Sequence, residues 1–78
     1  MNNLEKYNNV FAETFDVAVD ELNGLKYQDI PAWDSIGHMS LVVALEETFK
    51  ITLDTDDIID MSSFEKGKET LVKYDIIF

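Results

Sequence analysis

The chain has 78 residues, 46% of them hydrophobic, and its 16 acidic side chains against 6 basic ones give a formal net charge of -10 at pH 7. We expect one monomeric domain over residues 1–78 that binds no nucleic acid and favours basic protein partners, although acidity can also serve solubility alone. With no long apolar segment, no leader-like start and no cysteine, the expected location is cytoplasmic, with no membrane span.

The first predicted element is a helix that begins after Asn2. Asn2 and Glu5 are spaced for a capping box, in which two side chains accept from each other's backbone amides. Apolar residues recur at intervals of three and four, which places them on one helical stripe. These residues are Leu4, Tyr7, Phe11, Phe15 and Ala18. The pattern fails after Asp20, and a polar segment that ends at Pro31 predicts a long loop.

The second predicted helix follows this loop, and Asp34 offers its N-cap. Its broad apolar face predicts that it is the most buried helix of the fold. The residues of this face are Ile36, Met39, Leu41, Val42, Val43, Ala44, Leu45 and Phe49. Gly37 lies within the helix and costs about 1 kcal/mol relative to alanine. We hypothesise that an enzyme, or a group attached nearby, approaches the backbone closely at Gly37.

Two further helices complete the predicted fold. The third is short, begins at Asp54 or Thr55 and ends at Asp60. Its apolar residues, which we expect to face inward, are Ile58 and Ile59. The last helix begins with a capping box formed by Ser62 and Glu65. Its apolar stripe comprises Phe64, Leu71, Val72 and Tyr74. We therefore predict an all-α bundle of three main helices plus one short helix.

Ser35 is the residue best placed for chemistry. It follows the predicted cap Asp34, so its hydroxyl lies at the first turn of a helix, where free amides and the helix dipole stabilise an anion by about 0.3–1 kcal/mol. From these local features alone, a purely structural role in capping is the favoured explanation of the serine. His38 follows on the same helix, on its exposed side by our expectation. A hydrolase built on these three residues is disfavoured, because consecutive helical residues cannot form nucleophile, base and orienting group in series.

The segment Asp34-Ser35-Ile36, followed by Leu-Val-Val-Ala-Leu-Glu-Glu-Thr-Phe-Lys-Ile over residues 41–51, resembles the attachment-site helix of acyl carrier proteins. Both the serine motif and the downstream run occur at the family's spacing, and the similarity covers essentially the whole chain. Gly37 and Ser40 stand where fatty-acid-synthesis members usually carry acidic residues. These departures bear on the pathway and not on the carrier role.

The resemblance implies that a phosphopantetheinyl transferase attaches 4′-phosphopantetheine from coenzyme A to Ser35, beside Asp34. The thiol of this arm would then carry an acyl or aminoacyl group between separate loading and transfer enzymes, and the chain itself would catalyse nothing. The resemblance also implies a cargo slot beside the second and third helices, although core packing is the default explanation of its residues. The slot candidates are Val42, Leu45, Phe49, Ile58 and Ile59.

A partner surface is implied as well, facing basic patches on those enzymes. From charge alone, a solvated polar face is the simpler explanation of its acidic part. The candidate residues are Ile36, His38, Met39, Glu46, Glu47, Asp56, Asp57 and Asp60. The main alternative function is an unmodified acidic helical adaptor that binds a basic protein. No metal site is expected, because the calcium-loop-like start at Asp54 lacks the third ligand and the turn glycine.

Overall fold

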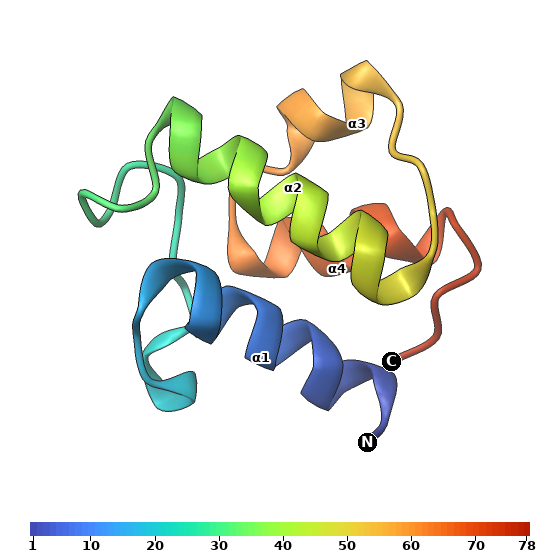
Figure 1. The fold of residues 1–78 in the computed structure, drawn as a ribbon, viewed down its shortest axis with the longest axis horizontal. Coiled ribbons are helices and arrows are strands. Elements are labelled where there is room, and N and C mark those ends of the chain that lie inside the picture. Colours follow the sequence, from blue (N-terminus) through green and yellow to red (C-terminus); the bar gives the residue numbers. More distant parts are fainter.

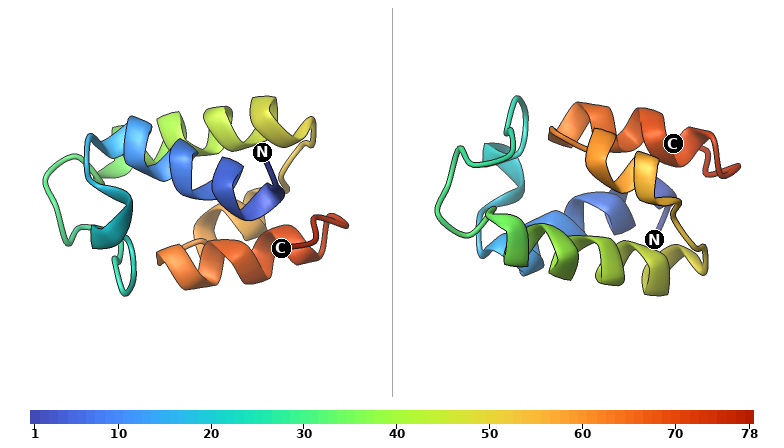
Figure 2. Two further views of the ribbon diagram at one scale, coloured as in Figure 1. Left: turned by 90° about the horizontal axis from the view of Figure 1, so that it is seen from below. Right: turned by 90° about the horizontal axis from the view of Figure 1, so that it is seen from above.

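The predicted pattern of three main helices and one short helix is confirmed in the computed structural model, which describes residues 1–78. The elements in Figure 1 are α1 (Asn3–Phe15), a 3-10 turn η1 (Val19–Glu21), α2 (Ser35–Phe49), α3 (Thr55–Asp60) and α4 (Phe64–Val72). α1 and α2 pack beside each other, α4 lies across the core from them, and α3 covers α2 and α4 (Figure 2). None of the helices has the length and apolar character needed to cross a bilayer.

α1 begins where the sequence predicts and ends earlier. The Asn2 side chain accepts a hydrogen bond from the Glu5 amide at 2.8 Å, which is the N-cap half of the expected capping box. The helix stops at Asp16, whose φ of 54° is left-handed, a conformation that aspartate tolerates better than most residues. Ala18 therefore lies outside the helix and Leu4 is exposed, so neither joins the buried stripe. That stripe comprises Tyr7, Val10, Phe11 and Phe15.

The loop between η1 and α2 is held against the start of α4. The Tyr27 amide donates to the Ser62 carbonyl at 2.9 Å, and the Phe64 amide donates to the Leu25 carbonyl at 2.8 Å. Trp33, at the end of the loop, is fully buried and packs against aromatic rings of α1. The loop therefore fixes where α2 begins, and with it the position of the candidate site.

The predicted capping box of α4 is wrong by one residue. Ser63 is the N-cap, and its hydroxyl accepts the Lys66 amide at 2.9 Å, whereas Ser62 lies outside the cap. Glu65 does not reach back to the cap. Its side chain accepts a hydrogen bond from the Gly24 amide at 3.0 Å instead, which is a further hydrogen bond between the loop and α4.

α2 is less buried than the sequence predicts. Only Leu41, Val42 and Leu45 are buried along it, fewer than in α1, so the prediction that it is the most buried helix is wrong. The helix is apolar almost all round, but only one face can meet the core. On α3, Ile59 points outward, because consecutive helical residues lie about 100° apart and Ile58 takes the inner position. The apolar residues that α2, α3 and α4 leave exposed are Ile36, Met39, Val43, Ile59 and Val72.

Candidate functional site

Ser35 is the first residue of α2, and its side chain is exposed. Asp34 is the N-cap as predicted, and its Oδ1 accepts the Gly37 amide at 2.8 Å. The amides of Ser35 and Ile36 donate to no protein acceptor, as is usual in the first turn of a helix. Free amides at the positive end of the helix dipole stabilise an anion. A phosphate ester on Ser35 Oγ therefore fits this position.

Gly37 is required by a contact within the chain. A Cβ atom at this position would lie 1.8 Å from the carbonyl oxygen of Ala32 and 3.4 Å from Asp34 Oδ1. The loop backbone thus crosses the first turn of α2 too closely for any other residue. This internal contact explains the glycine without the approach of an enzyme or an attached group that the sequence suggested.

His38 is half-buried, so the expectation that it lies on the exposed side is wrong. Its Nδ1 accepts from the indole nitrogen of Trp33 at 2.9 Å, and its Nε2 lies 2.8 Å from the Ile58 carbonyl oxygen. An indole N–H can only donate, so the proton of the neutral ring is on Nε2 and is donated to Ile58. His38 thereby links the loop, α2 and α3. With both nitrogens engaged, it is not a base for Ser35.

A groove of about 380 Å³ separates the start of α2 from α3, and we call it the α2–α3 groove. Its lining residues are Tyr27, Ser35, His38, Met39, Ile58, Ile59, Met61 and Ser62. Of the slot candidates, only Ile58 and Ile59 are among them. Val42 and Leu45 are buried in the core and Phe49 is half-buried near the other end of α2, so none of these three lines the groove.

The outer face of α2 carries a second, wider hollow of about 630 Å³. It is lined by Ser35, Ile36, Met39, Ser40, Val43, Ala44 and Glu47. Two of the residues predicted to contact partners, Ile36 and Met39, are therefore brought together here, and Glu47 lies with them. Ser35 and Met39 line both hollows, so the candidate attachment residue stands where the two meet.

The acidic residues predicted for the partner surface divide into two groups. Glu46 is half-buried, and its Oε2 accepts the Leu53 amide at 2.8 Å, which holds the segment after α2. Asp57 is engaged at the end of α4. The remaining three are exposed and free to meet a partner: Glu47, Asp56 and Asp60. The histidine and the acidic side chains form no group that could hold a metal ion.

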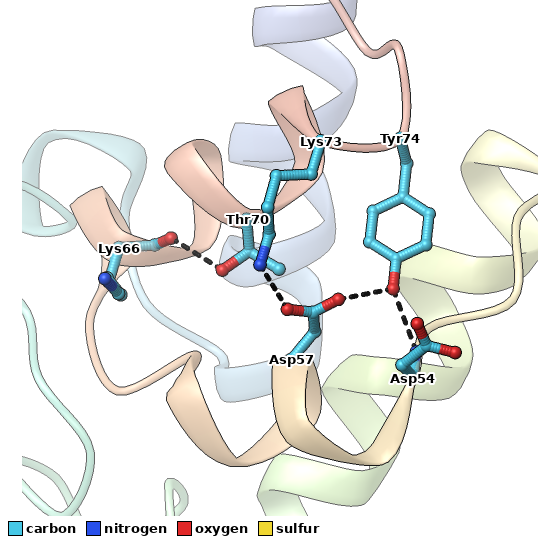
Figure 3. A network of polar contacts seen from close by, with 6 residues as sticks. All are labelled: Asp54, Asp57, Lys66, Thr70, Lys73 and Tyr74. Carbon is cyan, nitrogen blue, oxygen red and sulfur yellow. Dashed lines mark hydrogen bonds and ion pairs between the residues drawn. The ribbon is translucent and has the colours of Figure 1, made fainter.

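The contacts of Asp57 fasten α3 to the C-terminal end of α4, as Figure 3 shows. Asp57 forms an ion pair with Lys73 and accepts a hydrogen bond from the Tyr74 phenol at 2.6 Å. The same phenol accepts the Asp54 amide at 2.9 Å. The hydrogen bonds from Lys73 and Tyr74 hold the pKa of Asp57 below its ordinary value. The hydrogen bond to Asp57 in turn raises the pKa of Lys73. Asp57 therefore has a structural role and is not a free partner contact.

Comparison of the chain with family models, curated proteins and solved structures finds no match. Function is therefore inferred from the residues of this chain and their arrangement.

Proposed function

We propose that this chain is a carrier protein that holds an acyl or aminoacyl group as a thioester on a 4′-phosphopantetheine arm attached to Ser35. The observation that carries the proposal is the Asp34-Ser35-Ile36 motif at the start of α2, where Ser35 is exposed. Asp34 and His38, the polar neighbours of Ser35 on this helix, are engaged in structural hydrogen bonds. Ser35 is thus presented to a modifying enzyme by a site that performs no chemistry of its own.

Attachment of the arm uses the Ser35 hydroxyl and the free backbone amides beside it. Ser35 Oγ bonds to the phosphorus that bears the pantetheine, the pyrophosphate P–O bond of coenzyme A breaks, and 3′,5′-ADP leaves. A base of the transferase takes the hydroxyl proton. The free amides of Ser35 and Ile36 stabilise the phosphodiester charge. The arm, once bound, supplies the thiol for thioester chemistry that a chain without cysteine lacks.

The α2–α3 groove gives an apolar cargo a place beside the attachment residue. Met39, Ile58 and Ile59 line it, and Ser35 stands in its wall. Each methylene buried there contributes about 0.8 kcal/mol, so even a short apolar chain gains protection from water. A polar aminoacyl group gains much less free energy from burial and stays outside the α2–α3 groove.

The exposed apolar residues of α2 form the surface that we propose for partner enzymes. Ile36, Met39 and Val43 are exposed on one side of the helix, and Glu47 shares their hollow. An apolar strip with acidic neighbours suits a transferase or acyl-transfer enzyme whose docking patch is basic and partly apolar. The same strip also favours the alternative, an unmodified acidic adaptor that binds a basic protein, because such binding needs no arm.

Intact-mass spectrometry distinguishes these two functions. The purified chain is incubated with coenzyme A and a broad-specificity phosphopantetheinyl transferase, beside the variants Ser35→Ala and Ser40→Ala. Ser40 is an exposed serine of the same helix and serves as the matched control. The carrier function predicts a gain of one phosphopantetheinyl group by the native chain and by Ser40→Ala, and none by Ser35→Ala. No gain by the native chain, with the transferase active on a control carrier, favours the adaptor.

A further inference from the structure

We propose that Tyr27 is a positioning residue for the attachment reaction at Ser35 and remains a hydrogen-bond donor to the phosphodiester that forms there. The inference rests on the proposed carrier function. The Tyr27 phenol oxygen lies 3.2 Å from Ser35 Oγ, and both residues line the α2–α3 groove. This is the one side-chain hydrogen bond that the Ser35 hydroxyl makes. No sequence motif indicates it, since Tyr27 belongs to the loop.

Tyr27 is held in place independently of Ser35. Its amide donates to the Ser62 carbonyl at 2.9 Å, which ties its backbone to the start of α4. Its ring meets Trp33 edge to face, with 6.4 Å between ring centroids, and meets His38 in the same way at 5.6 Å. Trp33 and His38 are themselves joined by a hydrogen bond of 2.9 Å. The phenol is therefore a preorganised group, which orients Ser35 at little additional entropic cost.

Two other polar side chains close to Ser35, those of Asp34 and His38, have their hydrogen bonds elsewhere. Asp34 Oδ1 accepts from the Gly37 amide. Both ring nitrogens of His38 are used by Trp33 and Ile58. Tyr27 alone thus supplies a side-chain hydrogen bond to the Ser35 hydroxyl.

The direction of this hydrogen bond follows from the chemistry. In the unmodified chain either oxygen can donate. When Tyr27 donates to Ser35 Oγ, the serine proton points away and is available to the base of the transferase. During attachment Oγ bonds to phosphorus, the P–O bond to the leaving 3′,5′-ADP breaks, and that base takes the proton. Afterwards Oγ has no hydrogen, so Tyr27 must be the donor. The charge of the phosphodiester lies on its two non-bridging oxygens, and a hydrogen bond from Tyr27 to one of these is stronger than one to a neutral hydroxyl.

Tyr27→Phe tests this inference, because it removes one oxygen and keeps the ring against Trp33 and His38. Tyr74→Phe is the matched control, since its phenol belongs to the Asp57 contacts and not to Ser35. We expect Tyr27→Phe to lower kcat/KM for arm attachment by about three- to tenfold, mainly in kcat, as for the loss of one hydrogen bond. We also expect a changed 31P chemical shift of the attached phosphodiester. Tyr74→Phe should leave both quantities as in the native chain.

A native chain that accepts the arm, together with a Tyr27→Phe variant of unchanged kcat/KM, overturns the positioning role and leaves the carrier function standing. A native chain that never accepts the arm overturns both. Circular dichroism of the two variants before modification establishes that each is folded, so that a slower reaction of Tyr27→Phe reports on Ser35 and not on unfolding.

Discussion

Replacement of Gly37 by alanine is expected to destabilise the protein, contrary to the usual effect of this change in a helix. Helix propensity alone predicts a gain of about 1 kcal/mol. The new methyl group, however, would stand 1.8 Å from the Ala32 carbonyl oxygen, which is backbone and cannot rotate away. Overpacking of this kind costs about 1–3 kcal/mol. Moving the loop to relieve it also disturbs the Asp34 cap, whose hydrogen bond is worth about 1 kcal/mol.

The net expectation is a loss of about 1–3 kcal/mol in the free energy of unfolding, which lowers the Tm of a domain of this size by about 4–24 °C. Urea denaturation followed by circular dichroism measures it. Ser40→Ala is the control, because Ser40 is exposed on the same helix and its replacement should be neutral or slightly stabilising. A Gly37→Ala variant as stable as the native chain would refute the close contact between the loop and α2.

Two further predictions concern the attachment of α3. Lys73 lowers the pKa of Asp57 in the folded chain. The ion pair therefore contributes to folding stability above the ordinary carboxyl pKa of 3.8, and this contribution is lost as the pH falls through the lower pKa of the folded state. The NMR signal of the Asp57 side-chain carboxyl should therefore titrate below pH 3.8, and a midpoint for this carboxyl at or above 3.8 would contradict the contact. His38→Asn keeps an acceptor for the Trp33 indole but loses the hydrogen bond to the Ile58 carbonyl. His38→Gln keeps the hydrogen bond to the Ile58 carbonyl but loses the acceptor for Trp33. Faster amide exchange of α3 is expected in His38→Asn only, and equal exchange in both variants would contradict the assigned hydrogen bonds.

Local signals in the sequence predicted much of the fold. The caps at Asn2 and Asp34 could be predicted because the capping side chain and the amide it accepts lie three residues apart. The end of α1 could not, since the apolar spacing continues to Ala18 and a left-handed Asp16 leaves no comparable pattern. The capping box at Ser62 failed because Ser63 is an equally good N-cap by residue type, even though only Ser62 has a glutamate three residues later.

The site was predictable where it depends on one helix and not where it depends on contacts between elements. Ser35 could be placed at the first turn of α2, whereas the apolar spacing assigns Ile36 and Met39 to the buried face of this helix and both are exposed. The burial of His38 depends on an indole from the loop and a carbonyl of α3, and Tyr27 reaches Ser35 from a segment without periodicity. Hydrophobic spacing also cannot tell which side of a helix faces the core when most sides are apolar. Val42 and Leu45, for which core packing was the default explanation and a cargo slot was implied only by the resemblance, are core residues.

We propose that Ser35 carries the phosphopantetheine arm, and peptide-level mass spectrometry can locate the arm on a single residue. The chain is expressed together with a phosphopantetheinyl transferase and digested, and the peptide that contains Ser35 is fragmented. We expect one phosphopantetheinyl group on this peptide, located on Ser35 and not on Ser40. A Ser35 peptide that remains unmodified while a control carrier is fully converted in the same cells would contradict the carrier function.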